Sequence, residues 1–189
     1  MEISSRWDRQ GIKSSICRNP SGDHEDNKKV VALEADLGGA SGFTKIQKTN
    51  PDQFVQVGIA EANMVGIAAG MSMRGYIPYI HTLPPFATRR VLDQVFLEGA
   101  YAKNTINIYG SDPGVCVAAN GGTHNSFEDI ALMRSIPETL VVAPADEVQL
   151  AWTIRECAKL TACTISAPTE KAILRCMRKA PPLNSARAM

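Results

Sequence analysis

The chain has 189 residues, enough for one domain with a buried core, and 44% of its residues are apolar. Lys and Arg together number 20 and Asp and Glu number 19, a balance that gives no sign of a nucleic-acid or membrane surface. The 5 cysteines are odd in number and no pair has CxxC spacing, so neither a zinc site nor a disulfide framework is expected. Residues 1–29 lack the apolar run of a signal peptide and no segment has the length of a transmembrane helix, so a cytoplasmic protein is expected.

Short apolar runs alternate with segments of helical spacing along the chain. Residues 1–28 are expected to form a loosely ordered polar leader, residues 29–180 the folded domain and residues 181–189 a tail. Strands are expected at Val30–Ala35, Phe54–Val57, Ile77–His81, Thr105–Tyr109 and Leu140–Ala143, and helices at 61–73, 89–103, 126–135 and 146–159. This alternation predicts an α/β fold with a doubly wound, mostly parallel sheet and helices on both faces. Ligands bind at the carboxyl ends of strands in such sheets, so we expect a site at the glycine-rich loops that follow Ala35 and Tyr109.

Glu61 lies where a short strand meets a helix rich in small residues, among them Gly66 and Gly70. The small residues predict that this helix packs very close to another element. Acidic residues are common in the first turn of a helix because they interact favourably with the helix dipole, and that alone would explain Glu61.

Several longer runs, in the same order and at similar separations, resemble the pyrimidine-binding domain of transketolases between Val30 and Lys159. The runs are EADLGG, GIAEANMVGIAAG, PYIHTLPPFATRRVLDQV and GGTHNSFEDIALMRSIPETLVVAPAD. The resemblance is greatest to the C-terminal subunit of split transketolases, in which the diphosphate-binding domain is a separate chain. It implies an enzyme that uses thiamin diphosphate and transfers a two-carbon ketol unit between sugar phosphates.

The resemblance also implies roles for individual residues. Glu61 matches the glutamate that hydrogen-bonds N1′ of the cofactor's aminopyrimidine and activates it, and Phe86 matches an aromatic residue that packs on this ring, although a phenylalanine often serves the core. Asp36 matches an acid near the cofactor, and a turn-forming residue is nearly as good an explanation. His124 matches a substrate-facing histidine, a residue suited to proton transfer near neutral pH.

Binding of the whole cofactor is expected to need a second chain. The Gly-Asp-Gly motif that binds diphosphate and Mg²⁺ in this family is absent from the sequence, so the partner chain would hold the metal. The small residues of the 61–73 helix imply close approach of another helix, so we expect a homodimer or a heterotetramer with the companion chain. Residues 168–182 faintly resemble the last strand of the domain, which would place Arg178 at a substrate phosphate.

Several substrate positions depart from the family pattern. The usual loop Glu-Asp-Gly-Pro-Thr-His is Ala119–His124 here, without its two acids and its proline, and Asp112 stands where a second histidine is expected. Ala40 replaces a serine and Leu83 an aromatic residue. These changes fall on sugar and phosphate contacts rather than on Glu61, so we expect cofactor activation with weak or altered sugar transfer.

Two other functions fit the same runs. A 1-deoxyxylulose-5-phosphate synthase would share them but use pyruvate, and a truncated, non-catalytic interaction domain would explain the missing acids. We interpret Arg89, Arg90, Asp93 and Gln94 mainly as interface and solvent residues. His81 ends a strand, and the sequence does not decide whether it faces the same cleft.

Overall fold

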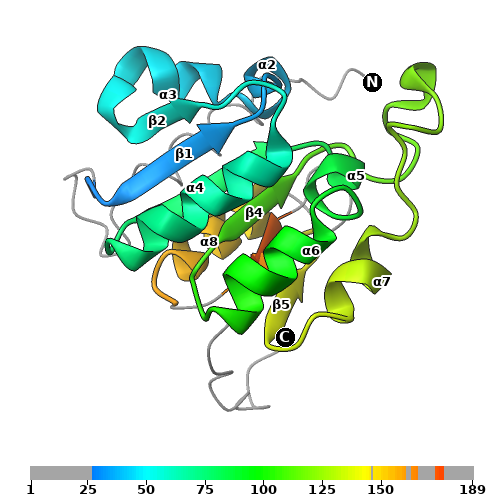
Figure 1. Ribbon diagram of the computed structural model, residues 1–189. Coiled ribbons are helices and arrows are strands. Elements are labelled where there is room, and N and C mark those ends of the chain that lie inside the picture. Colours follow the sequence, from blue (N-terminus) through cyan, green and yellow to red (C-terminus); the bar gives the residue numbers. More distant parts are fainter. Residues whose placement is uncertain (1–26, 146, 161–162, 166–172, 177–189) are drawn as a thin grey trace.

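The computed structural model describes residues 27–145, 147–160, 163–165 and 173–176, which form one layered α/β unit (Figure 1). The strands are β1 (Val30–Glu34), β2 (Phe54–Gln56), β3 (Ile77–Thr82), β4 (Asn107–Gly110), β5 (Thr139–Val142), β6 (Cys163–Ile165) and β7 (Ile173–Cys176). They form one sheet in the order β2-β1-β3-β4-β7-β5-β6. β1 to β4 run parallel, as do β5 and β6, whereas β7 is antiparallel to both β4 and β5. The expected mostly parallel sheet is confirmed.

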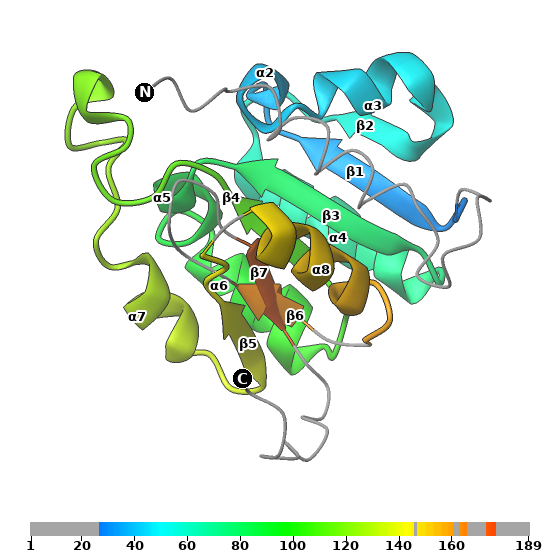
Figure 2. The same ribbon diagram turned by 180° about the vertical axis from the view of Figure 1, so that it is seen from behind.

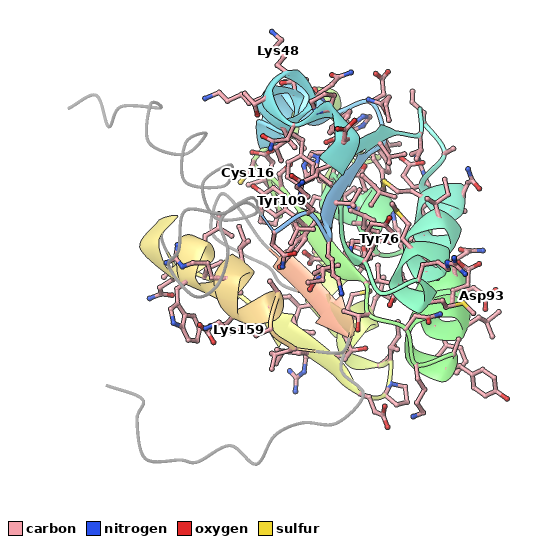
Figure 3. The ribbon with its side chains drawn as sticks, turned by 90° about the vertical axis from the view of Figure 1, so that its left-hand side faces the viewer. Lys48, Tyr76, Asp93, Tyr109, Cys116 and Lys159 are labelled. Atoms are coloured by element: carbon pink, nitrogen blue, oxygen red, sulfur yellow. The ribbon has the colours of Figure 1, made fainter. Side chains whose placement is uncertain are left out.

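Helices cover both faces of this sheet, as predicted (Figures 1 and 2). α4 (Glu61–Met73) and α6 (Leu92–Gln94), which continues as the π-helical segment η2 (Val95–Tyr101), lie on one face. α8 (Glu147–Cys157) lies on the other. With the sheet viewed from its side in Figure 3, Asp93 of α6 and Lys159 beyond α8 point outward on opposite sides. In the part of the chain that the structure describes, no helix is long and apolar enough to cross a bilayer.

The alternation of side chains along β1 divides the core between the two faces. Val31 and Leu33 pack in a cluster with Met64, Val65 and Ala68 of α4. The intervening residues of β1 face the opposite cluster, which contains Phe43, Tyr79, Tyr109, Leu150 and Ile154. A strand buried on both faces has an uninterrupted apolar sequence, and this explains the run at residues 30–33.

The remaining helices are short. They are α2 (Gly38–Ser41), α3 (Thr44–Thr49), η1 (Pro51–Gln53), α5 (Pro84–Ala87), η3 (Ala118–Asn120) and α7 (Asp129–Arg134). Of these, only α7 was predicted. The others have one or two turns, which carry too few residues for helical spacing to be recognised. α5 opens with two prolines, which the first turn tolerates because its N–H groups have no partner within the helix. Residue 146, at which the last predicted helix was expected to begin, lies outside the described residues.

A buried chain of polar side chains joins the carboxyl ends of β1, β3 and β4. Glu34, His81 and Ser111 are fully enclosed. His81 Nδ1 lies 2.8 Å from Glu34 Oε2, and its Nε2 lies 2.9 Å from Ser111 Oγ. Glu34 Oε1 also accepts hydrogen bonds from the backbone N–H groups of Ala35 and Leu37. His81 therefore lies inside the fold rather than in a cleft, and it links the loops after β1 and β4.

Removing the imidazole should strongly destabilise the fold. We expect His81→Ala to lower the free energy of unfolding by about 3–5 kcal/mol, because it removes a buried side-chain partner of the enclosed Glu34 carboxylate. Ser111→Ala removes a single hydrogen bond to the imidazole and should cost about 1 kcal/mol. Urea denaturation of both variants measures these free energies. Equal decreases in the two variants would show that the imidazole stabilises the fold no more than the Ser111 hydroxyl does.

Candidate functional site

Glu61 is the first residue of α4 and lies at the edge of the sheet where the β-strands end. Its side chain is 5% exposed, and Arg90 Nη1 donates a hydrogen bond of 2.7 Å to Glu61 Oε1. Arg90 comes from the segment between α5 and α6, which folds back over the start of α4. The sequence places a carboxylate at a helix N-terminus, and the fold encloses it beside a cation.

Phe86 lies in α5 beside the same arginine. The guanidinium carbon of Arg90 is 3.9 Å from the centroid of the Phe86 ring, a cation–π contact. The ring of His124 meets Phe86 at a centroid distance of 5.2 Å and an interplanar angle of 77°. The structure therefore links Glu61 to Phe86 through Arg90, and Phe86 to His124 through their rings, although the sequence separates these residues widely.

Arg89 fixes the loop that carries His124. Its Nη2 donates to the carbonyl oxygen of Thr123 at 3.0 Å, and its Nη1 donates to Glu128 Oε1 at 2.5 Å. The pKa of Glu128 is lowered from its ordinary value, chiefly by the hydrogen bond from the Phe127 backbone N–H and then by the hydrogen bond from Arg89. One arginine thus holds the loop and the next holds Glu61.

Asp36 stands apart from this group. It adopts a left-handed backbone conformation with φ 63°, and its backbone N–H donates to Gln56 Oε1 at 3.1 Å. Among the contacts of the described residues, none joins the Asp36 carboxylate to Glu61 or Phe86. This geometry supports its role in the turn, while its approach to a cofactor stays a prediction. Arg178, the expected phosphate contact, lies outside the described residues.

Only some of the small residues of α4 pack closely against another part of the chain. A Cβ added at Gly66 would lie 3.2 Å from Glu98 Oε2, so this glycine leaves room for the Glu98 carboxylate. Desolvation by burial raises the pKa of Glu98. Gly70 is exposed, and a Cβ there would meet nothing within 4 Å. Close packing against η2 thus explains Gly66 but leaves Gly70 on the surface.

An open hollow of about 550 Å³ adjoins the arginine pair. It is lined by Arg89, Arg90, Leu92, Asp93, Gln94, Phe96, Ser135 and Ile136. It does not include Glu61. Within the described ranges, no group of three or more His, Cys, Asp or Glu side chains could hold a metal ion.

Sequence reasoning missed the role of the two arginines. Both are partly exposed, as an interface or solvent residue would be, but each makes a specific contact within the site. The only available signal was their position three and four residues after Phe86. Neither contact could be inferred from that spacing, because it depends on how α5 turns back toward α4.

The geometry defines an α/β sheet with a buried carboxylate and an aromatic ring at its carboxyl edge. Residues 24–169 match the family described as transketolase, pyrimidine binding domain, and the chain belongs to this family. The resemblance noted in the sequence is therefore confirmed.

Relatives in this family include subunits of split enzymes. The chain is 46% identical over 126 residues to the 6-deoxy-6-sulfo-D-fructose transketolase subunit SqwH of Clostridium sp. (strain MSTE9), covering 67% of this chain and 39% of that protein. It is 37% identical over 123 residues to an apulose-4-phosphate transketolase subunit of Phocaeicola vulgatus, covering 65% and 39%. A solved split gene transketolase, an inactive beta4 tetramer, matches with a TM-score of 0.68 and 31% identity over 81% of this chain and 48% of that one. The chain thus spans about two fifths of the length of these curated relatives.

The contact between Arg89 and Glu128 should make the loop sensitive to acid. Because the folded pKa of Glu128 is lowered, its stabilising contribution is present above the ordinary glutamate pKa and is lost as the pH falls through the lowered value. In an NMR titration we expect the Glu128 carboxylate to titrate below an ordinary glutamate, and Arg89→Ala to shift the Glu128 midpoint upward. An unchanged midpoint in Arg89→Ala would contradict the assigned contact.

Proposed function

We propose that this chain supplies the pyrimidine-side half of a thiamin diphosphate site in a transketolase-like enzyme, with Glu61 as the cofactor-activating residue. The observation that carries the proposal is that one guanidinium, that of Arg90, contacts both the enclosed Glu61 carboxylate and the face of Phe86. The flat guanidinium of Arg90 stacks on Phe86 and donates a hydrogen bond to Glu61. Phe86 and Glu61 can therefore bind a flat heterocycle that also forms hydrogen bonds. The residues present therefore fit the aminopyrimidine.

Each residue would have a defined task in that site. Glu61 would hold or give a proton at the ring nitrogen N1′, and its enclosure keeps competing water away. Phe86 would orient the ring by stacking, and Asp36 would approach it from the turn after β1. Bound thiamin diphosphate supplies the carbanion-stabilising chemistry that no protein side chain provides.

The reaction we propose is transfer of a two-carbon ketol unit between sugar phosphates. His124 would face the substrate and exchange protons with its hydroxyl groups, because imidazole titrates near neutral pH. Arg178 would contact the substrate phosphate. The relative that is 46% identical carries 6-deoxy-6-sulfo-D-fructose in its name, so this sugar belongs among the donors to be tested.

The enzyme would need a second kind of chain. We propose a diphosphate-binding partner that holds Mg²⁺, in a heterotetramer built on a dimer of this chain, and a cytoplasmic location. The subunit names of the relatives support a divided enzyme. The exposed Gly70 on α4 supports close approach by another chain.

A second candidate is a 1-deoxy-D-xylulose-5-phosphate synthase activity. Proteins of that name match this chain, for example at 36% identity over 126 residues in Synechococcus sp. (strain CC9605). That reaction would require pyruvate as donor, so a donor assay separates the two activities. A non-catalytic interaction domain would bind the partner chain without any turnover.

Loss of the Glu61 proton site should abolish most activity. We expect Glu61→Gln, assembled with the partner chain, to lower the rate of ketol transfer by roughly 10²–10⁴-fold, the usual contribution of a positioned acid or base. Glu138→Gln, which changes an exposed glutamate paired with Lys103, is the matched control and should keep wild-type activity. Transfer from sugar phosphate and sulfo-sugar donors is measured, with pyruvate as the alternative donor. Full activity in Glu61→Gln would refute the assigned role.

A further inference from the structure

Arg90 makes, within the chain itself, both contacts that the proposed function assigns to the aminopyrimidine ring. Its guanidinium lies 3.9 Å from the centroid of Phe86, and its Nη1 donates to Glu61 Oε1 at 2.7 Å. A guanidinium is flat, delocalised and rich in hydrogen-bond donors, so it meets the same chemical demands as a protonatable heterocycle.

Two flat groups cannot stack on the same face of Phe86 at the same time. A ring stacked on the face of Phe86 that Arg90 covers would need the volume of the guanidinium. A ring nitrogen hydrogen-bonded to Glu61 Oε1 would also compete with Nη1 for that oxygen. The position of Arg90 in the chain alone is therefore incompatible with a pyrimidine at the same contacts.

We propose that Arg90 occupies the aminopyrimidine-binding position at Glu61 and Phe86 in the cofactor-free chain and moves away when the cofactor binds. This arginine would then lower the affinity of the site for thiamin diphosphate. The inference rests on the proposed function, because it takes Glu61 and Phe86 as the pyrimidine contacts.

The surroundings provide a place for the displaced side chain. Arg90 also lines the hollow of about 550 Å³ beside α6, whose wall includes the carboxylate of Asp93. Figure 3 shows Asp93 pointing outward on this side of the sheet. The Arg90 side chain is already 44% exposed, so little additional surface becomes exposed to solvent when it moves. A displaced Arg90 side chain could therefore remain in this hollow, near the acidic residue Asp93.

The size of the effect follows from the contacts that are lost. The Arg90 side chain is half-exposed although Glu61 is enclosed, so we expect its competition with the cofactor to correspond to roughly a three- to tenfold change in affinity. Arg90→Met keeps the length of the side chain and removes its charge and planarity. Arg90→Lys keeps the charge without the flat group and should fall between Met and wild type. Arg74→Met, at the exposed C-terminal end of α4, is the matched control.

The contact is tested first in the chain alone, by urea denaturation. Arg90→Met should lower the urea midpoint in the wild-type background and lower it less in a Glu61→Gln background, where only the contact with Phe86 is lost in full. Equal shifts in both backgrounds would overturn the inference, because Arg90 and Glu61 would not be coupled in solution.

Cofactor affinity is then measured by equilibrium dialysis of thiamin diphosphate with Mg²⁺ against this chain mixed with its diphosphate-binding partner chain. We expect Arg90→Met to bind roughly three- to tenfold more tightly than wild type, and Arg74→Met to bind like wild type. Equal or weaker binding by Arg90→Met, with wild type binding, overturns the inference and leaves the proposed function standing. If the urea coupling is present and neither form binds, the proposed function fails, and the inference falls with it.

Discussion

The hydrogen-bond chain from Glu34 through His81 to Ser111 is the constraint on which the site edge depends. It crosses the carboxyl ends of three neighbouring parallel strands, where loops of unrelated sequence must be held in one arrangement. A fully enclosed carboxylate is costly unless charge or hydrogen bonds compensate it, and here an imidazole and two backbone N–H groups do so. The turn after β1 and the loop after β4 therefore start from fixed positions.

Two adjacent arginines connect the segment between α5 and α6 to the residues of the candidate site. Arg89 ties down the loop of His124 through carbonyl oxygens and Glu128, while Arg90 spans Glu61 and Phe86. Their side chains point to different partners because they lie in the irregular segment between α5 and α6. The site is thus held by cations that sit at its rim, and their charges face groups on three separate elements.

The sequence was sufficient to predict the α/β class, the strands β1 to β5, the span of the Glu61 helix and the family, but not the order of the strands in the sheet. Alternation of apolar runs defines strands buried on both faces, and the boundaries of 61–73 agree with α4 because glycines flank a long apolar helix. Phe86 and His124 were predicted as site residues from motif resemblance, and the structure places their rings in contact, with Arg90 linking Phe86 to Glu61. The Arg90 contact and the buried role of His81 could not be predicted, since each depends on which strands become neighbours. For Asp36, the motif resemblance predicted a position near the cofactor. The structure instead offers a local reason for this residue, because it adopts a left-handed conformation in the turn after β1.

Calorimetric titration of thiamin diphosphate with Mg²⁺ into this chain mixed with its diphosphate-binding partner tests the central claim most directly. We predict saturable binding that requires both chains and weakens in Glu61→Ala, because the proposed function divides the cofactor site between the two chains and assigns the pyrimidine contact to Glu61. Absence of binding, with both chains shown to be folded and associated, would contradict the claim and favour an interaction domain without cofactor chemistry.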